Sequence, residues 1–259
     1  MIEQVTLGPT TCHFLTRDTF DRIAAGWLTQ NHLHHIVTLN PEMVMAAATN
    51  HAFAAAINNA TLRVPDGAGI IWARWYLRSS YWSLWPSLVA FPGVAAERLT
   101  GINVIARLSR LAAAQGKSVY LLGGTPQQNR KTARLLQKNH PSLTVYTGPD
   151  HTYDLTGPVA VLADINLKRP DILFVAYGAP KQSLWINQHR KNLPSVKIAV
   201  GVGGAFAILS EDKPRAPRWL RQHNLEWLWR LILEPSRAKR IYTATIKFPL
   251  LIHQQKLDR

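Results

Sequence analysis

The chain has 259 residues, of which 47% are hydrophobic, so it is long enough to bury one full core. Its 30 Lys and Arg face 15 Asp and Glu, and the formal charge of +15 favours an anionic partner: nucleic acid, a phosphate-bearing ligand or an anionic membrane surface. Cys12 is the only cysteine, which excludes an internal disulfide and suits a reducing compartment. The sequence shows neither a signal peptide nor an apolar run of the roughly 18–20 residues that span a bilayer, which predicts a cytoplasmic protein and leaves membrane contact open.

The first residues of the chain predict a small strand-and-helix unit, with a helix near residues 18–30. A histidine cluster follows at His32, His34 and His35, and we interpret it as a solvated turn that leads into a strand. A metal site is the alternative, but no cysteine or carboxylate shares the cluster.

A buried strand is expected over residues 36–39, where the sequence is a short apolar run. Asn40 is the expected N-cap of a helix and Pro41 its first residue. The Ala-rich stretch 42–59 is predicted to be helical and to complete a βαβ unit. Thr38 and Asn40 therefore lie at a strand end, beside a helix N-terminus that favours anions.

Residues 61–71, TLRVPDGAGII, place a single carboxylate on a glycine turn. Pro65 favours extended geometry before it, and Gly67 and Gly69 allow a sharp turn and the close approach of a ligand. Asp66 is thus expected at the carboxyl end of a strand, where open α/β sheets bind their ligands. On this stretch alone, an Asp that caps the following helix is the alternative.

Aromatic residues crowd the stretch 74–92 and its surroundings: Trp72, Trp75, Tyr76, Tyr81, Trp82, Trp85 and Phe91. Core packing is one interpretation. The other is a surface that dips into the membrane interface, a boundary that Trp and Tyr favour. Pro86 and Pro92 argue against one straight helix and predict a bent, partly exposed hairpin.

Strands and helices alternate through the central part of the chain. Strands are expected over 118–122, near 143–146, over 171–176 and over 197–200, separated by helices near 102–115, 126–138, 158–168 and 183–190. Several strands end in glycine or polar loops, which is a weak nucleotide signal without the full fingerprint. The alternation predicts an α/β fold: a Rossmann-like, mostly parallel sheet flanked by helices, with the site at the strand ends.

The composition changes after Lys213. Residues 213–259 contain eleven Lys and Arg against three carboxylates, a local net charge of +8, and tryptophans lie among the cations. Helices are expected near 218–233 and 236–252. We interpret the chain as a core over residues 1–212 and a basic helical appendage over 213–259 that can lie on an anionic membrane, with a plain solvated helical face as the alternative.

Eight stretches, taken in order, resemble the WecG/TagA/CpsF family of glycosyltransferases: VTLNPEMV, VPDGAGIIWA, ERLTGINVI, YLLGGT, RPDILFVAYGAPKQ, GVGGAF, PRAPRW and LEWLWRLILEPSRAKR. They cover about residues 34–245. The resemblance implies a fold of the GT-E type and an inverting transferase at the inner face of the bacterial cell membrane. Such an enzyme moves N-acetylmannosamine, or its uronic acid, from UDP to a polyprenyl-diphosphate-linked N-acetylglucosamine for surface polysaccharide synthesis.

Position by position, the resemblance implies that Asp66 is the general base that takes the proton of the acceptor hydroxyl, as a single inverting displacement requires. It implies substrate contacts by Thr38, Asn40, Arg98, Gln182, Gly123, Gly124, Gly201, Gly203, Gly204, Arg230, Arg237 and Arg240. The sequence has no Asp-x-Asp pair that would hold a metal on a sugar nucleotide. Arginines of the tail are therefore expected to stabilise the leaving UDP, and neither a metal nor another cofactor is expected.

Asn103, Ser183 and Ala207 depart from the family, which commonly has Asp, Glu and Asp there, and the Trp-rich stretch is longer than usual. These differences leave the sugars open, so transfer of another UDP-hexose is an alternative. A nucleic-acid-binding protein would need basic residues along a groove but no lone carboxylate. A nicotinamide-dependent dehydrogenase would need a G-x-G-x-x-G turn after the first strand, which is missing. Expected partners are the UDP-sugar, the lipid-linked acceptor and an anionic membrane, without nucleic acid; the oligomeric state is left open.

Overall fold

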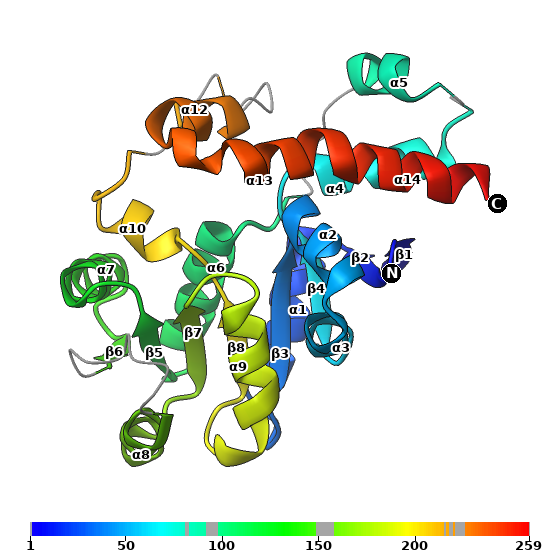
Figure 1. Cartoon of the computed structure of the whole chain (residues 1–259). Helices are drawn as coiled ribbons and strands as arrows, with labels where there is room; N and C mark the ends of the chain where they lie inside the picture. Colours follow the sequence, from blue (N-terminus) through cyan, green and yellow to red (C-terminus); the bar gives the residue numbers. More distant parts are fainter. Residues whose placement is uncertain are drawn as a thin grey trace.

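The computed structural model of the chain describes residues 2–80, 83–91, 98–148, 158–214, 216–217, 220 and 226–258. Its centre is a six-stranded parallel sheet with helices on both faces, which confirms the predicted α/β architecture (Figure 1). The order of the strands across the sheet is β4-β3-β8-β7-β5-β6. Their bounds are β3 (His34–Leu39), β4 (Leu62–Pro65), β5 (Ser118–Gly123), β6 (Thr144–Thr147), β7 (Ile172–Ala176) and β8 (Ile198–Gly201).

Each central strand is buried on both faces, as parallel sheets require. In β7, Ile172 and Phe174 belong to one apolar cluster, whereas Leu173 and Val175 belong to another. The first cluster includes residues of α1 (Arg17–Trp27), α6 (Gly101–Ala114), α7 (Pro126–Asn139) and α10 (Ala205–Leu209). The second includes residues of α8 (Pro158–Lys168) and α9 (Lys181–His189).

A third apolar cluster lies at the β3–β4 end of the sheet. It joins Val37 and Leu39 to the antiparallel hairpin of β1 (Glu3–Leu7) and β2 (Thr10–Phe14), and to α2 (Pro41–Thr49), α3 (His51–Asn58) and α4 (Ala68–Arg78). The stretch 42–59, predicted as one helical segment, is two helices. Asn50 divides them because its side-chain oxygen accepts the backbone N–H of Phe53 and so caps α3.

The C-terminal part of the chain crosses the molecule above the sheet (Figure 1). It contains α12 (Glu226–Leu233), a 3-10 turn (Pro235–Arg237), α13 (Ala238–Tyr242), a π-helical turn (Thr243–Lys247) and α14 (Phe248–Leu257). The π turn ends two residues before Pro249, whose missing N–H breaks the regular α-helical ladder. Phe248 and Ile252 are fully buried in the third cluster, so α14 is part of the core; the boundary at residue 212 stays a prediction.

The aromatic stretch forms two helices, α4 and α5 (Leu84–Ala90). Trp72 and Tyr76 of α4 are buried and stacked on each other, which confirms the core-packing interpretation for these two residues. Trp85 of α5 is 54% exposed, so this part of the stretch is at the surface, and its contact with the membrane interface stays a prediction. Trp82 and Pro92 lie outside the described residues.

Two histidines of the predicted cluster, His34 and His35, lie in the core because the strand begins at His34, whereas His32 is exposed on the turn before it, as predicted. The ring of His34 stacks on Trp27 at 4.2 Å, and its Nε2 bonds the side chain of Gln30. Burial lowers the pKa of His35 to about 3, with Arg190 and Arg63 nearby adding to the effect. Burial and Arg63 likewise lower the pKa of His13 to about 4.

These histidines predict acid sensitivity. An unfolded histidine binds its proton near pH 6.5, but a buried neutral one does not, so the free energy of unfolding falls as pH drops from about 6.5 towards 4. Each such group contributes up to about 1.4 kcal/mol per pH unit. His35→Leu should make the decline between pH 7 and pH 5 shallower, measured by urea unfolding against the exposed control His51→Leu. An unchanged slope in His35→Leu would contradict the assignment.

Candidate active site

Asp66 lies directly after β4, on the turn that the sequence predicted. Its backbone N–H donates to the carbonyl of Leu39 at 2.8 Å, and the carbonyl of Pro65 accepts the N–H of Leu99 at 3.0 Å. Gly67 has a φ of +101°, which favours glycine, and a Cβ there would meet only Pro41, at 3.9 Å. The turn is thus fixed through its backbone from two sides, and the half-buried Asp66 follows the carboxyl end of a strand.

Thr38 and Asn40 lie at the end of β3, the strand next to β4. The hydroxyl of Thr38 donates to the carbonyl of Gly201 at 3.3 Å and so ties β3 to β8. The side-chain oxygen of Asn40 accepts the backbone N–H of Met43 at 2.9 Å, which confirms the predicted N-cap of α2. The oxygens of both side chains are engaged within the fold, so their substrate contacts stay a prediction.

Gln182 joins the loops after β7 and β8. It is 3% exposed, and its Oε1 accepts the backbone N–H of Gly203 at 2.9 Å. A Cβ on Gly201 would lie 2.5 Å from Nε2 of Gln182, so only glycine fits there. Around Gly203 and Gly204 the space is open, which leaves room for a ligand beside their backbone.

Gly123 is the last residue of β5 and Gly124 follows it; β5 is separated from β4 by three strands. Four inter-strand steps of about 4.8 Å place them roughly 19 Å from the Asp66 strand. A Cβ on Gly123 would lie 2.9 Å from the ring of Tyr177, and one on Gly124 would lie 3.0 Å from Phe206. Close packing therefore explains both glycines, and their approach to a nucleotide stays a prediction.

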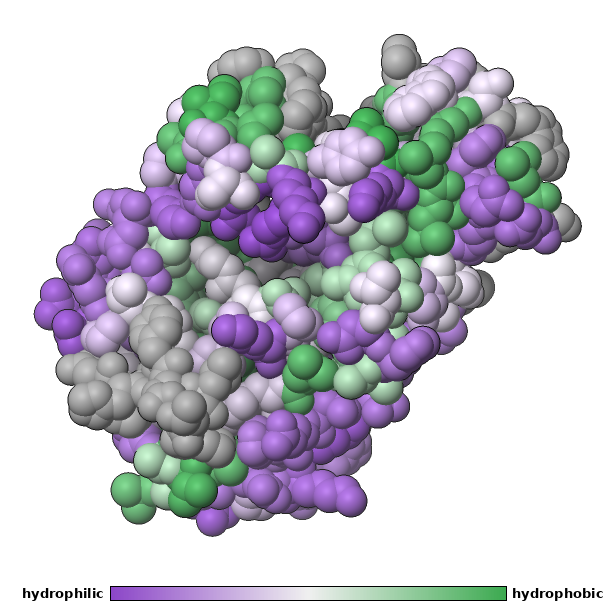
Figure 2. Space-filling view, viewed as in Figure 1, coloured by the Kyte–Doolittle hydropathy of each residue, from purple (hydrophilic) through white to green (hydrophobic). Residues whose placement is uncertain are grey.

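The tail carries arginines over this edge of the sheet, and Figure 2 shows a hollow between the tail and the body of the protein. Arg240 of α13 forms an ion pair with Glu42 of α2, with Nη2 and Oε2 2.6 Å apart. Glu42 lies two residues after Asn40, so the contact brings Arg240 to the strand ends. Arg237 instead pairs with Glu234, and Arg230 lies in α12.

Comparison with known proteins identifies the family of the chain. The model of the glycosyl transferase WecG/TagA/CpsF family matches residues 6–259. The chain belongs to this family. It is 31% identical over 211 residues to proteins of Staphylococcus aureus strains MRSA252, NCTC 8325 / PS 47 and COL, with 82% of this chain and 76% of each relative covered. Each relative is named N-acetylglucosaminyldiphosphoundecaprenol N-acetyl-beta-D-mannosaminyltransferase.

As a glycosyl transferase of this family, the protein is an enzyme, which favours the predicted function over the dehydrogenase and nucleic-acid-binding alternatives. Within the described residues, no group of three or more His, Cys, Asp or Glu side chains is arranged to hold a metal. No helix in that part of the chain is both long and apolar enough to cross a bilayer.

The sequence did not indicate the ion-pair partners of the predicted arginines. Glu42 pairs with Arg240, and Glu234 pairs with both Lys213 and Arg237. Hydrogen bonds from Lys213 and then Arg237 lower the pKa of Glu234 to about 2. Glu42 pairs with a residue 198 positions away, a separation that no local pattern reveals. The backbone places Arg98 beside the Asp66 turn, because the next residue, Leu99, donates its N–H to the carbonyl of Pro65.

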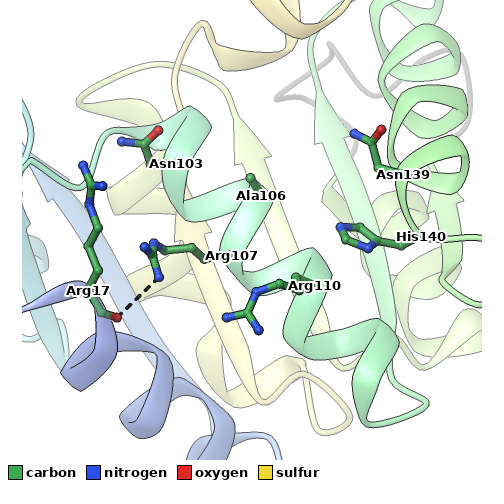
Figure 3. A pocket seen from close by; sticks show the side chains of 7 residues that line it. All are labelled: Arg17, Asn103, Ala106, Arg107, Arg110, Asn139 and His140. Carbon is green, nitrogen blue, oxygen red and sulfur yellow. Dashed lines mark hydrogen bonds between the residues drawn. The ribbon is translucent and has the colours of Figure 1, made fainter.

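A second hollow, of about 620 Å³, runs along α6 between α1 and the end of α7 (Figure 3). Its lining residues are Arg17, Asn103, Ala106, Arg107, Arg110, Asn139 and His140. Arg107 and Arg110 both pair with Asp21 of α1, so much of their charge serves the packing of α1 on α6. This lining contains no carboxylate that could act as a base, and we therefore place the candidate active site of the glycosyl transferase at the strand ends.

Proposed function

We propose that this enzyme transfers N-acetylmannosamine, or its uronic acid, from UDP to a polyprenyl-diphosphate-linked N-acetylglucosamine. The placement of Asp66 carries the proposal, because one carboxylate on an open glycine turn is what a single displacement requires. The names of the relatives support the sugar and the acceptor. Transfer of another UDP-hexose is the alternative.

In the proposed reaction, Asp66 accepts the proton of an acceptor hydroxyl as its oxygen attacks the anomeric carbon of the donor. The bond from that carbon to the UDP oxygen breaks on the opposite face, and UDP leaves with the electron pair. Mass analysis of products from a panel of UDP-sugars, with a short-chain prenyl-diphosphate-linked acceptor, tests the donor. Transfer from UDP-N-acetylmannosamine or its uronic acid supports the proposal, and exclusive use of another sugar contradicts it.

We propose that tail arginines, rather than a divalent metal, stabilise the charge that develops on UDP. Support comes from Arg240, which the ion pair with Glu42 holds at the strand ends. Turnover should therefore persist in excess EDTA, and activity that returns only with added Mg²⁺ or Mn²⁺ would contradict this.

Arg240→Met should lower turnover by about 10²-fold, the loss typical of removing one donor to developing negative charge. Lys239→Met is the matched control, because Lys239 is the preceding, exposed cation of the same helix. Steady-state rates at saturating substrates are the measurement. Equal losses in both variants would show that the general charge of the tail matters, and not the placement of Arg240.

We also propose that the enzyme docks peripherally on an anionic membrane through the side that carries α5, α12, α13 and α14. Exposed apolar side chains lie on these helices, and Figure 2 shows hydrophobic patches over α12 and over the α5–α14 region. They are Trp85, Ile232, Leu233, Tyr242 and Leu250. Exposed Lys239 and Lys247 lie among them, and each basic residue near an anionic leaflet contributes about 1 kcal/mol.

Trp85→Ser should weaken binding to anionic vesicles while leaving the melting temperature nearly unchanged, because the ring is 54% exposed. Leu167→Ser is the control, since Leu167 is 81% exposed on α8, away from the proposed surface. Cosedimentation with anionic and with neutral vesicles measures the effect. A large loss of stability with intact vesicle binding would contradict the membrane role of Trp85.

A further inference from the structure

Helix α4 is one element through which the rest of the protein can act on Asp66. It begins at Ala68, two residues after the carboxylate, and Gly67 caps it without a side-chain hydrogen bond. Its 11 residues form a rod of about 16 Å, whose buried face includes Ile70, Ile71 and Tyr76. Any shift of this rod along its axis moves the Asp66 turn.

The first turn of α4 is wedged between two rings. A Cβ on Gly69 would lie 2.7 Å from Cγ of Pro41 and 3.8 Å from Cε1 of Phe248. Pro41 is the first residue of α2, next to Asn40, and Phe248 is the fully buried first residue of α14. The start of α4 therefore has a fixed distance from both the β3 end and the C-terminal helix.

The last turn of α4 is held by the same C-terminal helix. Lys256 is 6% exposed, and its ammonium group donates to the carbonyls of Tyr76 at 2.6 Å and Ser79 at 2.7 Å. It also lies 4.3 Å above the centre of the Tyr76 ring, whose hydroxyl bonds His253 at 2.6 Å. The carbonyl of Tyr76 also accepts the N–H of Ser79 at 3.2 Å and the hydroxyl of Ser79 at 3.0 Å. Carbonyls at a helix C-terminus carry partial negative charge, so a buried cation fits there.

Helix α14 is itself fixed at a third point. The side chain of Gln255 accepts the N–H of Gly8 and donates to the carbonyl of Thr6, both at 2.9 Å, and so bonds the turn of the β1–β2 hairpin. The segment before α14 carries Arg240, which pairs with Glu42 of α2. One run of helical turns thus connects the tail arginine, the start of α4 and the end of α4.

We propose that Lys256 is a positioning residue for the transfer reaction: it clamps the end of α4 so that Asp66 stays aligned with the acceptor hydroxyl. The inference rests on the proposed role of Asp66 as the base. Misplacement of a reacting group by about 1 Å can cost as much as 10²-fold in rate. A small shift of α4 away from α14 would therefore be enough to slow the reaction.

The test compares Lys256→Met and Lys256→Arg with Lys168→Met. Lys168 is a matched control, since its ammonium group also bonds a backbone carbonyl, that of Thr147, and lies 5.7 Å from the centre of a tyrosine ring, that of Tyr120. For Lys256→Met, kcat should fall by about 10-fold or more, with the KM for the UDP-sugar nearly unchanged. Lys256→Arg should recover most of kcat, and Lys168→Met should retain it.

Hydrogen exchange of the α4 amides near Gly69 provides a readout besides activity, and it should be faster in Lys256→Met than in Lys168→Met. If Lys256→Met does not fold, Lys256→Gln, which keeps an N–H donor, takes its place. A folded variant with normal kcat and normal exchange would overturn the inference, as would an equal loss of kcat in Lys168→Met. Full activity of Asp66→Asn, by contrast, would contradict the proposed function. The hydrogen-exchange comparison would still test whether Lys256 holds α4 in place.

Discussion

Asp66→Asn should lower turnover by about 10²–10⁴-fold, the usual contribution of a general base, while the fold and the binding of UDP are retained. The reason is that an amide of the same shape cannot accept the acceptor proton. The turn itself should survive, because backbone hydrogen bonds to Leu39 and Leu99 hold it. Single-turnover rates and UDP binding by calorimetry are the measurements.

The control for this variant is Asp18→Asn, which removes an exposed carboxylate from the first turn of α1. Its turnover should match that of the unmodified enzyme. Near-normal turnover of a folded Asp66→Asn protein would show that Asp66 is not the base, independently of the other proposed site residues.

Phe248→Ala should reduce the free energy of unfolding by about 3–5 kcal/mol, as expected when a buried aromatic ring is removed and leaves a cavity. Phe248 is fully buried and contacts the first turn of α4 near Gly69. Urea unfolding is the measurement. A loss of this size would show that α14 belongs to the cooperative core.

Leu250→Ala is the matched control for Phe248→Ala, because Leu250 is 46% exposed two residues further along the same helix. Exposed positions of this kind usually change stability by less than about 0.5 kcal/mol. If Phe248→Ala also costs less than about 1 kcal/mol, α14 folds independently of the sheet, and the boundary predicted at residue 212 describes the whole tail correctly.

The sheet could be predicted from the sequence because its strands are short apolar runs that end in distinctive loops. Asn40-Pro41 marked the start of α2 correctly, since a side-chain cap and a proline at the first helical position are local signals. The Asp66 turn was equally local, with a proline before it and a glycine of positive φ after it. Asn50 was overlooked as a helix boundary because the alanines around it favour helix on both sides.

The tail shows what local patterns do not contain. Its charge predicted a membrane-binding appendage, yet nothing in the sequence around Lys256 indicates that its ammonium group reaches Tyr76, 180 residues earlier. Gly124 shows the same limit, because a glycine that the sequence assigns to a nucleotide turn also packs against the ring of Phe206, so its role in nucleotide binding stays a prediction. Both cases depend on contacts between distant segments, which are set by packing rather than by periodicity.

The configuration of the new glycosidic bond tests the central claim most directly. The enzyme is given an α-configured UDP-N-acetylmannosamine donor and a short-chain prenyl-diphosphate-linked N-acetylglucosamine acceptor, and the product is examined by nuclear magnetic resonance. A single displacement with Asp66 as the base predicts a β-linked disaccharide. An α-linked product would contradict the account, because retention requires a mechanism other than one in-line attack by the acceptor hydroxyl.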